Sequence, residues 1–442
     1  MTELTIVPEP TPTQTPAQTP STAPVETRAA AAIAECRLLA TMTEEAGRIT
    51  RRYLTPPVAK VHDHLRKRME SLSMTVTVDA AGNLRGLWQL HPARPEKRLV
   101  IGSHIDTVPD AGAFDGVLGV VLALELVAEA QAKSIPIAIE VIAFSEEEGV
   151  RFGVPFLGSR AVAGRFDQAL LDLHDADGVS LEQSIRDFGL DPSAMSEALL
   201  SDEAVAFLEI HIEQGPVLES EKLPLAVVTA VAGQTRCEVT FTGQANHAGT
   251  TPMHLRRDAL IAAAEWIVAV EQVAERHPQN VQFDQGLVAT VGKLIVEPNA
   301  GNVVAGLARA TLDVRSARES ARLEAVEQLL DRARTIALVR GLTCEVRHKM
   351  DQPAVSMDEE LTALLADSVE AAGFPVRRMP SGAGHDAMVM ATRVPTAMLF
   401  LRSPGGISHH PAENVIEEDV AAALEAGGVF LQRIAAKLSM QN

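Results

Sequence analysis

Histidine and carboxylate side chains recur in this sequence where apolar runs end, and both residue types bind metal ions or carry protons. His104 and Asp106 follow the apolar run 98–102, and Asp115 lies in the glycine-bounded turn that comes next. An imidazole beside a carboxylate that orients its second nitrogen is the usual surrounding of a metal-bound histidine. Taken alone, a His-x-Asp pair is more often structural, and Asp115 is equally typical of a helix N-cap.

A second polar segment consists of Glu146, Glu147 and Glu148, which follow the apolar run 137–144. Three adjacent carboxylates repel one another unless cations or protons compensate their charge. A charged surface loop explains the segment equally well in isolation. Together with the donors near His104, a metal site becomes the better explanation.

Further imidazoles come from two other segments. His211 lies between an apolar stretch and a turn at Gly215, and His409 and His410 follow the glycine pair 405–406. A lone histidine is more often a satisfied polar residue than a metal ligand. The combined set of His, Asp and Glu, without thiolates, suits zinc, manganese or cobalt.

The spacing of apolar residues predicts the elements that position these groups. The runs 98–102 and 137–144 indicate buried strands, and 116–132 between them has helical spacing. A strand, helix, strand order implies a parallel pair whose carboxyl ends lie side by side. Open α/β sheets place their sites at that edge, so the two polar segments are expected to meet there.

The remaining sequence predicts a tail and two domains. Residues 9–26 are rich in Pro, Thr and Gln and are expected to be disordered, and 29–54 has an apolar periodicity that predicts a helix. Between 233 and 350 the predicted order strand, helix, strand, strand, helix, strand is typical of a ferredoxin-like insert. The prediction is an α/β fold with residues 1–28 as the tail, 29–232 and 351–442 as a discontinuous catalytic domain, and 233–350 as a lid.

Composition narrows the functional classes. The chain has 442 residues, of which 46% are hydrophobic and only 3% aromatic, and this suits helices packed on a mostly parallel sheet. The net charge of −19 repels nucleic acid and anionic lipid at long range. Scattered cysteines fit a reducing compartment, and neither a secretory signal nor a membrane-spanning run stands out. We expect a cytoplasmic protein that binds neither nucleic acid nor membranes.

The ordered motifs resemble those of the M20-type metallohydrolases, in particular the hydantoinase/carbamoylase branch. That branch includes N-carbamoyl-L-amino-acid hydrolases, allantoate amidohydrolases and β-ureidopropionases. The resemblance covers nearly everything after the tail and implies a zinc-peptidase-like α/β domain with a ferredoxin-like lid that also forms a homodimer. The motifs are Gly102–Val108, Phe114–Gly116, Glu147–Gly153, His211–Gly215, Asn246–Met253, Ser381–Ala387 and Ser408–Pro411.

Carried over position by position, the resemblance implies a centre of two divalent metal ions, either zinc or manganese, cobalt or nickel. Asp115 would bridge the two ions. Glu147 would be the general base that shuttles the proton of a bridging water, and Asp106 would orient His104. The other implied ligands are His104 and His211 for one ion, and Glu148 and His409 for the other.

The resemblance also implies a substrate site between the two domains. Arg315 can hold a carboxylate bidentately, and His247 can donate a hydrogen bond to a developing oxyanion. Gln214, Asn302 and Gly384 are the other implied substrate groups. A surface ion pair is the alternative for Arg315, and the matching Asn302 favours the substrate role.

Three positions depart from the family pattern. Ala305 stands where relatives commonly have proline, and His410 stands where they have a small polar residue. The second departure leaves the ligand open between His409 and His410, although the order Ser-His favours His409. Glu146 is a third carboxylate where relatives often carry Asp or Asn, and it receives no role.

The predicted reaction is hydrolysis of the carbamoyl C–N bond of an N-carbamoyl-L-amino acid, which releases the amino acid, ammonia and carbon dioxide. Allantoate and N-carbamoyl-β-alanine are the alternative substrates within the branch. An M20-type peptidase is the runner-up, and a non-catalytic relative that binds a ureide or peptide is the last alternative. The intact donor set argues against the non-catalytic alternative, and the predicted partners are a small carboxylate-bearing ureide and a second copy of the chain.

Overall fold

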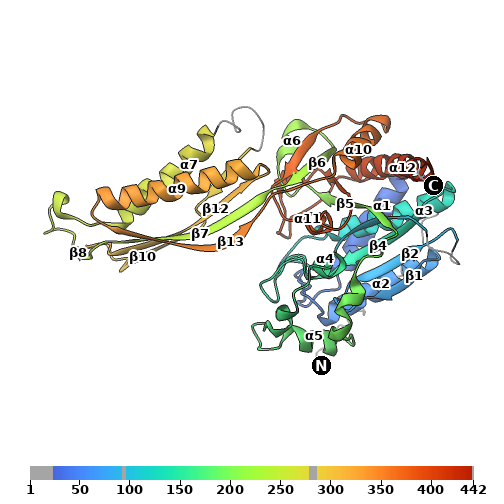
Figure 1. Ribbon diagram of the computed structural model, residues 1–442, viewed down its shortest axis with the longest axis horizontal. Coiled ribbons are helices and arrows are strands. Elements are labelled where there is room, and N and C mark those ends of the chain that lie inside the picture. The colour runs from blue at the N-terminus through green and yellow to red at the C-terminus, as the bar shows by residue number, and fades with distance from the viewer. Residues whose placement is uncertain (1–22, 92–95, 278–285, 441–442) are drawn as a thin grey trace, which may run out of the picture.

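The computed structural model describes residues 23–91, 96–277 and 286–440, and Figure 1 shows a larger and a smaller part side by side. The larger part is built on a nine-stranded sheet between helices, and the smaller on a separate five-stranded antiparallel sheet. The predicted α/β fold class is confirmed. In the small sheet, β7 (Gly233–Thr242) begins at the predicted lid boundary, and β13 (Thr343–Gln352) ends just beyond it.

The large sheet has the order β1-β2-β4-β3-β5-β16-β6-β14, with β15 beside β6. Its central strands β4, β3, β5 and β16 run parallel, as predicted for the first pair. All of these strands are fully buried except at the start of β5, because helices cover both faces. The strands are β1 (Thr75–Val78), β2 (Leu84–Trp88), β3 (Arg98–His104), β4 (Ala138–Phe144), β5 (Ala204–Ile212), β6 (Leu225–Val231), β14 (Val355–Ser356), β15 (Arg378–Ser381) and β16 (Thr396–Leu401).

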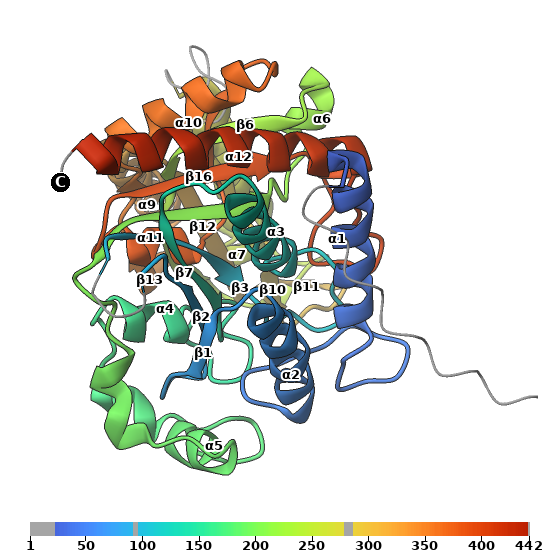
Figure 2. The same cartoon turned by 90° about the vertical axis from the view of Figure 1, so that its right-hand side faces the viewer.

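Helices form a layer on each face of this sheet. On one face α3 packs on β3 and β5 and is itself covered by α1 and α12, so it is apolar nearly all round (Figure 2). The opposite face carries α4 and α11. No helix in the described ranges is long and apolar enough to cross a membrane. The helices of the larger part are α1 (Val25–Ala40), α2 (Pro56–Ser71), α3 (Val117–Ala132), α4 (Leu157–Val162), α5 (Leu181–Asp187), α6 (Val217–Glu221), α10 (Glu359–Ala371), α11 (Asp386–Met390) and α12 (Glu417–Met440), with short 3₁₀ turns η1 (Gln168–Asp172), η2 (Pro192–Ala198) and η4 (Pro404–Gly406).

The first helix differs from the prediction at both ends. Its start at Val25 is earlier than predicted, because buried Arg28 pairs with Glu125 at 2.9 Å and Glu129 at 2.8 Å and ties the first turn to α3. The predicted tail therefore ends before Val25, and its residues 1–22 lie outside the described chain.

The helix also ends at Ala40, and the predicted continuation to residue 54 is wrong. Arg51 is fully buried, and its guanidinium donates to the carbonyls of Ile105 at 2.6 Å, Leu39 at 3.1 Å and Met42 at 3.1 Å. These bonds hold residues 41–55 as turns that fold back against the end of β3. The apolar side chains after residue 40 therefore belong to this turn and not to the helix.

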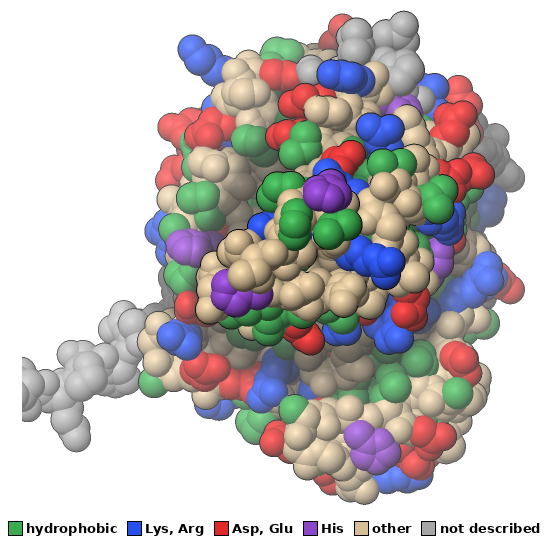
Figure 3. Space-filling model, turned by 90° about the vertical axis from the view of Figure 1, so that its left-hand side faces the viewer, with side chains coloured by type: hydrophobic (Ala, Val, Ile, Leu, Met, Phe, Trp, Pro, Cys, Tyr) green, Lys and Arg blue, Asp and Glu red, His purple; other side chains and the backbone are tan. Residues whose placement is uncertain are grey.

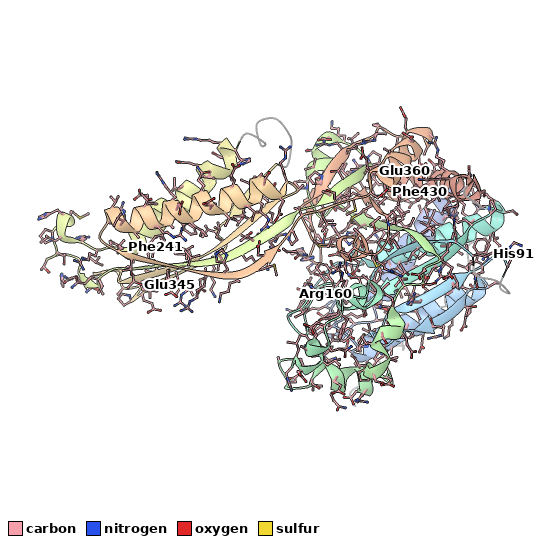
Figure 4. All side chains as sticks on the ribbon, viewed as in Figure 1. His91, Arg160, Phe241, Glu345, Glu360 and Phe430 are labelled. Atoms are coloured by element: carbon pink, nitrogen blue, oxygen red, sulfur yellow. The ribbon has the colours of Figure 1, made fainter. Side chains whose placement is uncertain are left out.

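The small sheet has the order β10-β12-β7-β13, with β9 beside β12, which is the predicted ferredoxin-like arrangement. Helices α7 and α9 cover one face, where Phe241 meets Trp266 edge-on at 6.1 Å. Figure 4 shows Phe241 on this covered face and Glu345 on the opposite, open face. The remaining elements are β8 (Asn246–His247), η3 (Met253–Leu255), α7 (Ala259–Arg276), β9 (Val288–Thr290), β10 (Leu294–Glu297), β11 (Val303–Val304), β12 (Leu307–Ser316) and α9 (Glu319–Val339).

Candidate metal centre

The side chains predicted as metal ligands lie together at the carboxyl end of the parallel strands. His104 ends β3, Glu148 follows β4, and His211 lies near the end of β5. Asp115 comes from the turn before α3, and His409 from the loop after η4. The set forms two groups, His104, Asp115 and His211, and Asp115, Glu148 and His409, and within each group the ligand atoms lie within 4.8 Å of one another.

Asp115 presents one carboxylate oxygen to each group. Its Oδ1 lies 3.2 Å from Nε2 of His211 and 3.7 Å from Nε2 of His104. Its Oδ2 lies 3.2 Å from Nε2 of His409, which in turn lies 3.3 Å from Oε1 of Glu148. A carboxylate placed in this way can serve two cations at once, one at each oxygen.

Both buried imidazoles turn Nε2 toward Asp115. The Nδ1 of His104 lies 3.1 Å from the carbonyl oxygen of Asp106, and the Nδ1 of His211 lies 2.9 Å from the carbonyl oxygen of Ile212. When Nδ1 donates to these carbonyls, the lone pair of each ring is on Nε2. This is the tautomer that a metal ligand needs.

The charge states of the set fit divalent cations. Burial lowers the pKa of His211 to about 4, so its ring is neutral at neutral pH. Although burial opposes it, the neighbouring carboxylates raise the pKa of His104 well above its usual range, so without a cation this ring carries a proton. Burial alone would raise the pKa of Asp115, but the adjacent rings of His104 and His409 hold it well below its usual range. Hydrogen bonds to Asp115 and Glu148 raise the pKa of His409 to about 10, so a proton lies where a cation would replace it. Neutral imidazoles and ionised carboxylates are the donors that zinc and manganese take.

Glu147 adjoins the candidate ligands. Its carboxylate and the ligand atoms of His104 and Glu148 lie within 4.8 Å of one another. Burial raises the pKa of Glu147 well above its usual range, and the charge of Glu148 adds to the effect. A buried carboxyl group of this kind is suited to take up a proton and return it.

The predicted orienting role of Asp106 takes a different form in the structure. Its carbonyl oxygen, and not its carboxylate, makes the hydrogen bond with His104, since Oδ1 is 3.7 Å from that ring. The carboxylate accepts the backbone N–H groups of Glu147 at 3.0 Å and Glu148 at 3.1 Å. Asp106 therefore ties the turn after β4 to the end of β3.

Two buried carboxylates without a predicted role brace the same centre. Oε1 of Glu413 accepts the backbone N–H of Asp115 at 3.1 Å, and Oε2 accepts the hydroxyl of Ser408 at 3.0 Å. Glu209 accepts the hydroxyl of Ser103 at 2.8 Å and the backbone N–H of Ala387 at 2.7 Å. A charged residue inside the apolar run of β5 is the signal by which Glu209 could have been found. Nothing local in the sequence marks Glu413, because its partners lie far away along the chain.

The structure also distinguishes the two adjacent histidines. His409 has φ of 54° and turns its ring toward Asp115 and Glu148. The ring of His410 is exposed, and its Nδ1 accepts the backbone N–H of Ala412 at 3.1 Å. His409 is therefore the imidazole that this loop brings to the centre.

A cavity of about 360 Å³ lies beside the centre, between it and the small sheet, and none of the candidate ligands lines it. Gln214 lines one end, and its Nε2 donates to Asp115 at 3.0 Å. Arg315 lines the other end, where its Nη1 donates to the carbonyl of Gly382 at 2.9 Å. Gly382 and Ala383 line the wall, while Gly384 packs against Phe156 so closely that a Cβ would lie 2.8 Å from the ring.

The other two predicted substrate residues are not near this centre in the single chain. His247 forms β8 and pairs with Val303 of β11, and the carbonyl of Asn302 accepts the N–H of Ala248 at 2.9 Å. Figure 1 shows β8 at the end of the small sheet farthest from the large one. The structure therefore brings His247 and Asn302 to each other but not to the candidate ligands.

Comparison with known proteins gives one family. The family model described as peptidase family M20/M25/M40 matches residues 100–433. Allantoate deiminase 1 of Glycine max is 36% identical over 430 residues, covering 91% of this chain and 89% of the relative. The N-carbamoyl-L-amino acid amidohydrolase of Geobacillus stearothermophilus is 36% identical over 386 residues, covering 86% and 92%.

Solved structures agree with this result. The crystal structure of an amidase of the hydantoinase/carbamoylase family from Burkholderia multivorans superposes with a TM-score of 0.84 at 31% identity. The match covers 92% of this chain and 97% of that one. The similarity therefore includes both sheets and the elements between them.

Proposed function

Because this chain belongs to peptidase family M20/M25/M40, within its hydantoinase/carbamoylase branch, we propose that it is a metal-dependent amidohydrolase of small ureides. The leading substrate is an N-carbamoyl-L-amino acid, whose carbamoyl C–N bond is cleaved to release the amino acid, ammonia and carbon dioxide. The observation that carries this proposal is the arrangement of Asp115 between two donor groups, with Glu147 beside them and a cavity that runs to Arg315.

His104 and His211 would hold one divalent ion, and Glu148 and His409 a second, with Asp115 as a ligand common to both. Such ions would polarise a carbonyl group and lower the pKa of a water molecule. Glu147 accepts the proton of the attacking water at its carboxylate and returns it to the leaving nitrogen. Its burial keeps bulk water from competing for that proton.

The other end of the cavity suits the substrate carboxylate. Asp313 accepts from Nε of Arg315 at 3.1 Å and from Nη2 at 3.2 Å, so the guanidinium is held on one edge. Its Nη1 donates to the Gly382 carbonyl, and a substrate carboxylate in the cavity can take the place of that carbonyl. In this arrangement Gln214 lies near the ureido group, and Gly384 shapes the wall through Phe156.

Allantoate is the second candidate substrate, favoured by the allantoate deiminases among the relatives. Allantoate shares the ureido group and the carboxylate, so the same two ends of the cavity would receive it. N-carbamoyl-β-alanine, a dipeptide and binding without turnover are the remaining alternatives. The alternative substrates would be hydrolysed at the same proposed centre and differ from an N-carbamoyl-L-amino acid in the groups joined by the scissile bond.

The activity is tested with a panel of N-carbamoyl-L-amino acids, allantoate, N-carbamoyl-β-alanine and dipeptides, assayed for ammonia or amine release with zinc, manganese, cobalt or nickel added. We expect release from N-carbamoyl-L-amino acids, complete loss with a chelator, and recovery on adding metal. Elemental analysis of the reconstituted protein should find close to two ions per chain. An active enzyme free of metal would refute the mechanism.

We further propose that His247 and Asn302 act in a homodimer. In this dimer the tip of the small domain, formed by β8 and β11, reaches the proposed metal centre of a second copy. The tip is open to solvent in the single chain (Figure 3), and both side chains are exposed. If a second copy supplies His247 and Asn302, the two residues can bind substrate although they lie far from the metal centre of their own chain.

Mixed variants test this arrangement. A His247→Ala chain keeps its own Glu147, and a Glu147→Gln chain keeps its own His247, so a mixed dimer would contain one complete site. Unfolding and refolding the two variants together should restore about a quarter of parental activity, the share expected for random pairing. If the mixture is no more active than the variants alone, His247 is not supplied by a partner.

A further inference from the structure

A second cavity, of about 720 Å³, adjoins the cavity that Gln214 and Arg315 line. The two share Val288, Arg315 and Gly382 as lining residues. A ligand whose carboxylate reaches Arg315 therefore has open space on the far side of that residue. The second cavity's charged lining residues on β7 and β12, Arg236, Asp313 and Arg315, alternate with the buried residues that face the helices, so they lie on the open face of the small sheet.

The pairing of β12 with β7 determines which charged side chains lie side by side in this cavity. Arg315 of β12 pairs with Gln234 of β7, and one step farther from the metal centre Asp313 pairs with Arg236. Paired residues share a face of the sheet, so these side chains stand in two neighbouring rows. Residues two apart on a strand are separated by roughly 7 Å.

The β-bulge in β13 adds a further cation. The pairing of β7 with β13 shifts between His348 and Met350, and Met350 is the partner of Arg236. Lys349 is the extra residue of this bulge, and it lines the same cavity. A bulge re-aims the side chains of its strand, which accounts for a lysine beside the Arg236 row.

The cavity therefore has an excess of positive charge. Among the described residues, Asp313 is the only carboxylate that lines it, against three cations: Arg236, Arg315 and Lys349. Although burial opposes it, hydrogen bonds from Arg315 and Arg236 keep the pKa of Asp313 below its usual range, so it is ionised and already engaged. In a chain with a net charge of −19, a local excess of cations is the opposite of the overall balance.

The bond that Arg236 makes to Asp313 uses Nε, at 2.9 Å, which leaves its terminal NH₂ groups for another acceptor. The side chain of Arg236 is 48% exposed, so a ligand can reach these groups without displacing the protein. Arg315, by contrast, is held on one edge by Asp313 and offers its other edge to the first cavity.

We propose that the second cavity binds the side chain of the substrate and favours ureido acids whose side chain ends in a carboxylate, with Arg236 and Lys349 as the recognising groups. This inference rests on the proposed function and narrows its substrate class. With the α-carboxylate on Arg315, the spacing of the two rows favours the longer side chain of N-carbamoyl-L-glutamate over that of N-carbamoyl-L-aspartate. Allantoate has a neutral second ureido group and would gain nothing from these cations.

The test compares N-carbamoyl-L-glutamate with N-carbamoyl-L-glutamine, which have the same shape and differ in one charge. Since Arg236 is half exposed, we expect the acid to exceed the amide in kcat/KM by about one-and-a-half- to fivefold. Arg236→Gln and Lys349→Gln should each lower this ratio, and the double variant should bring it close to one. Salt at 1 M should also lower the ratio in the parental enzyme, because the Debye screening length falls to about 3 Å.

Arg309→Gln is the matched control. Arg309 is on the same strand as Arg315 and pairs with Glu238, but it does not line the cavity, so its loss should leave the ratio unchanged. The proposal is overturned if the parental ratio is one or lower, if the double variant keeps it, or if Arg236→Gln lowers both substrates equally.

Failure of the proposed reaction is separated from failure of the subsite by calorimetry. If neither compound is hydrolysed, their binding to the metal-loaded protein is measured instead. Tighter binding of the glutamate compound that disappears in the double variant would support the subsite without the reaction. Equal binding of the two compounds would overturn it.

Discussion

The carboxylate of Asp106 binds the backbone of Glu147 and not the ring of His104. Its Oδ1 accepts the N–H of Glu147 at 3.0 Å, whereas the same oxygen lies 3.7 Å from Nδ1 of His104. The distance between the proposed base and the end of β3 is therefore set by a side chain that itself binds no proposed ion.

Replacing Asp106 with Asn should damage turnover more than metal binding. Asparagine has one acceptor oxygen, so one of the two backbone N–H groups now bonded at 3.0 and 3.1 Å would face an NH₂ group. Loss of such a supporting contact typically lowers activity about 10- to 100-fold. Steady-state kinetics together with elemental analysis measures both effects. Loss of the ions with an unchanged kcat in the remaining holoenzyme would assign Asp106 to the ligands instead.

Glu147→Gln should keep the ions and lose most turnover. The proposed ligands remain, but the amide cannot accept the proton of the attacking water. Loss of a general base costs on the order of a hundredfold or more in kcat. A purified variant with full metal occupancy and near-parental kcat would show that another group carries the proton.

The sequence was sufficient to predict the elements whose signals are local. The buried runs before His104 and Glu146 are strands, and their parallel pairing follows from the helix between them. This pairing brings together side chains that are far apart in the sequence, because strand ends meet at one edge. The motif residues around Asp115, His211 and His409 come to the same edge for this reason.

Other features depend on contacts that no local pattern predicts. The turn after Ala40 is held by buried Arg51, which an apolar periodicity cannot distinguish from a helical residue. Glu413 braces Asp115 through a hydrogen bond between residues in distant parts of the chain. The position of His247 at the far end of the small sheet depends on how β12 and β7 extend away from the large sheet. The order of the motifs along the chain does not predict this direction.

Arg315→Ala should lower kcat/KM for a ureido acid by roughly thirtyfold to several thousandfold, because losing a partly desolvated charge pair costs about 2 to 5 kcal/mol. Arg315→Lys should restore only part of this, since an ammonium lacks the planar fork that now spans Asp313 and Gly382. The measurement pairs each acid with its α-carboxamide. The parental enzyme should prefer the acid, and the Ala variant should lose that preference.

Arg309→Ala is the control for that experiment, because it removes an arginine from the same strand outside the cavity. Its acid-to-carboxamide ratio should equal the parental one. An unchanged ratio in Arg315→Ala would mean that Arg315 does not touch the substrate carboxylate, and the ureido-acid assignment would lose its main specificity argument.

Acid should destabilise the fold through His62, a buried residue of α2 whose ring meets Phe188 edge-on at 5.7 Å. Burial lowers the pKa of His62 to about 4, against about 6.5 in an unfolded chain. As the pH falls from 7 to 5, His62 therefore becomes protonated in the unfolded state but stays mostly neutral in the folded state. This difference lowers the free energy of unfolding by about 2 kcal/mol. Urea unfolding of His62→Gln at the two pH values should show a dependence smaller by that amount, whereas His174→Gln, at an exposed histidine, should keep the parental dependence. Equal pH dependence in His62→Gln and the parental protein would show that His62 is protonated equally in both states.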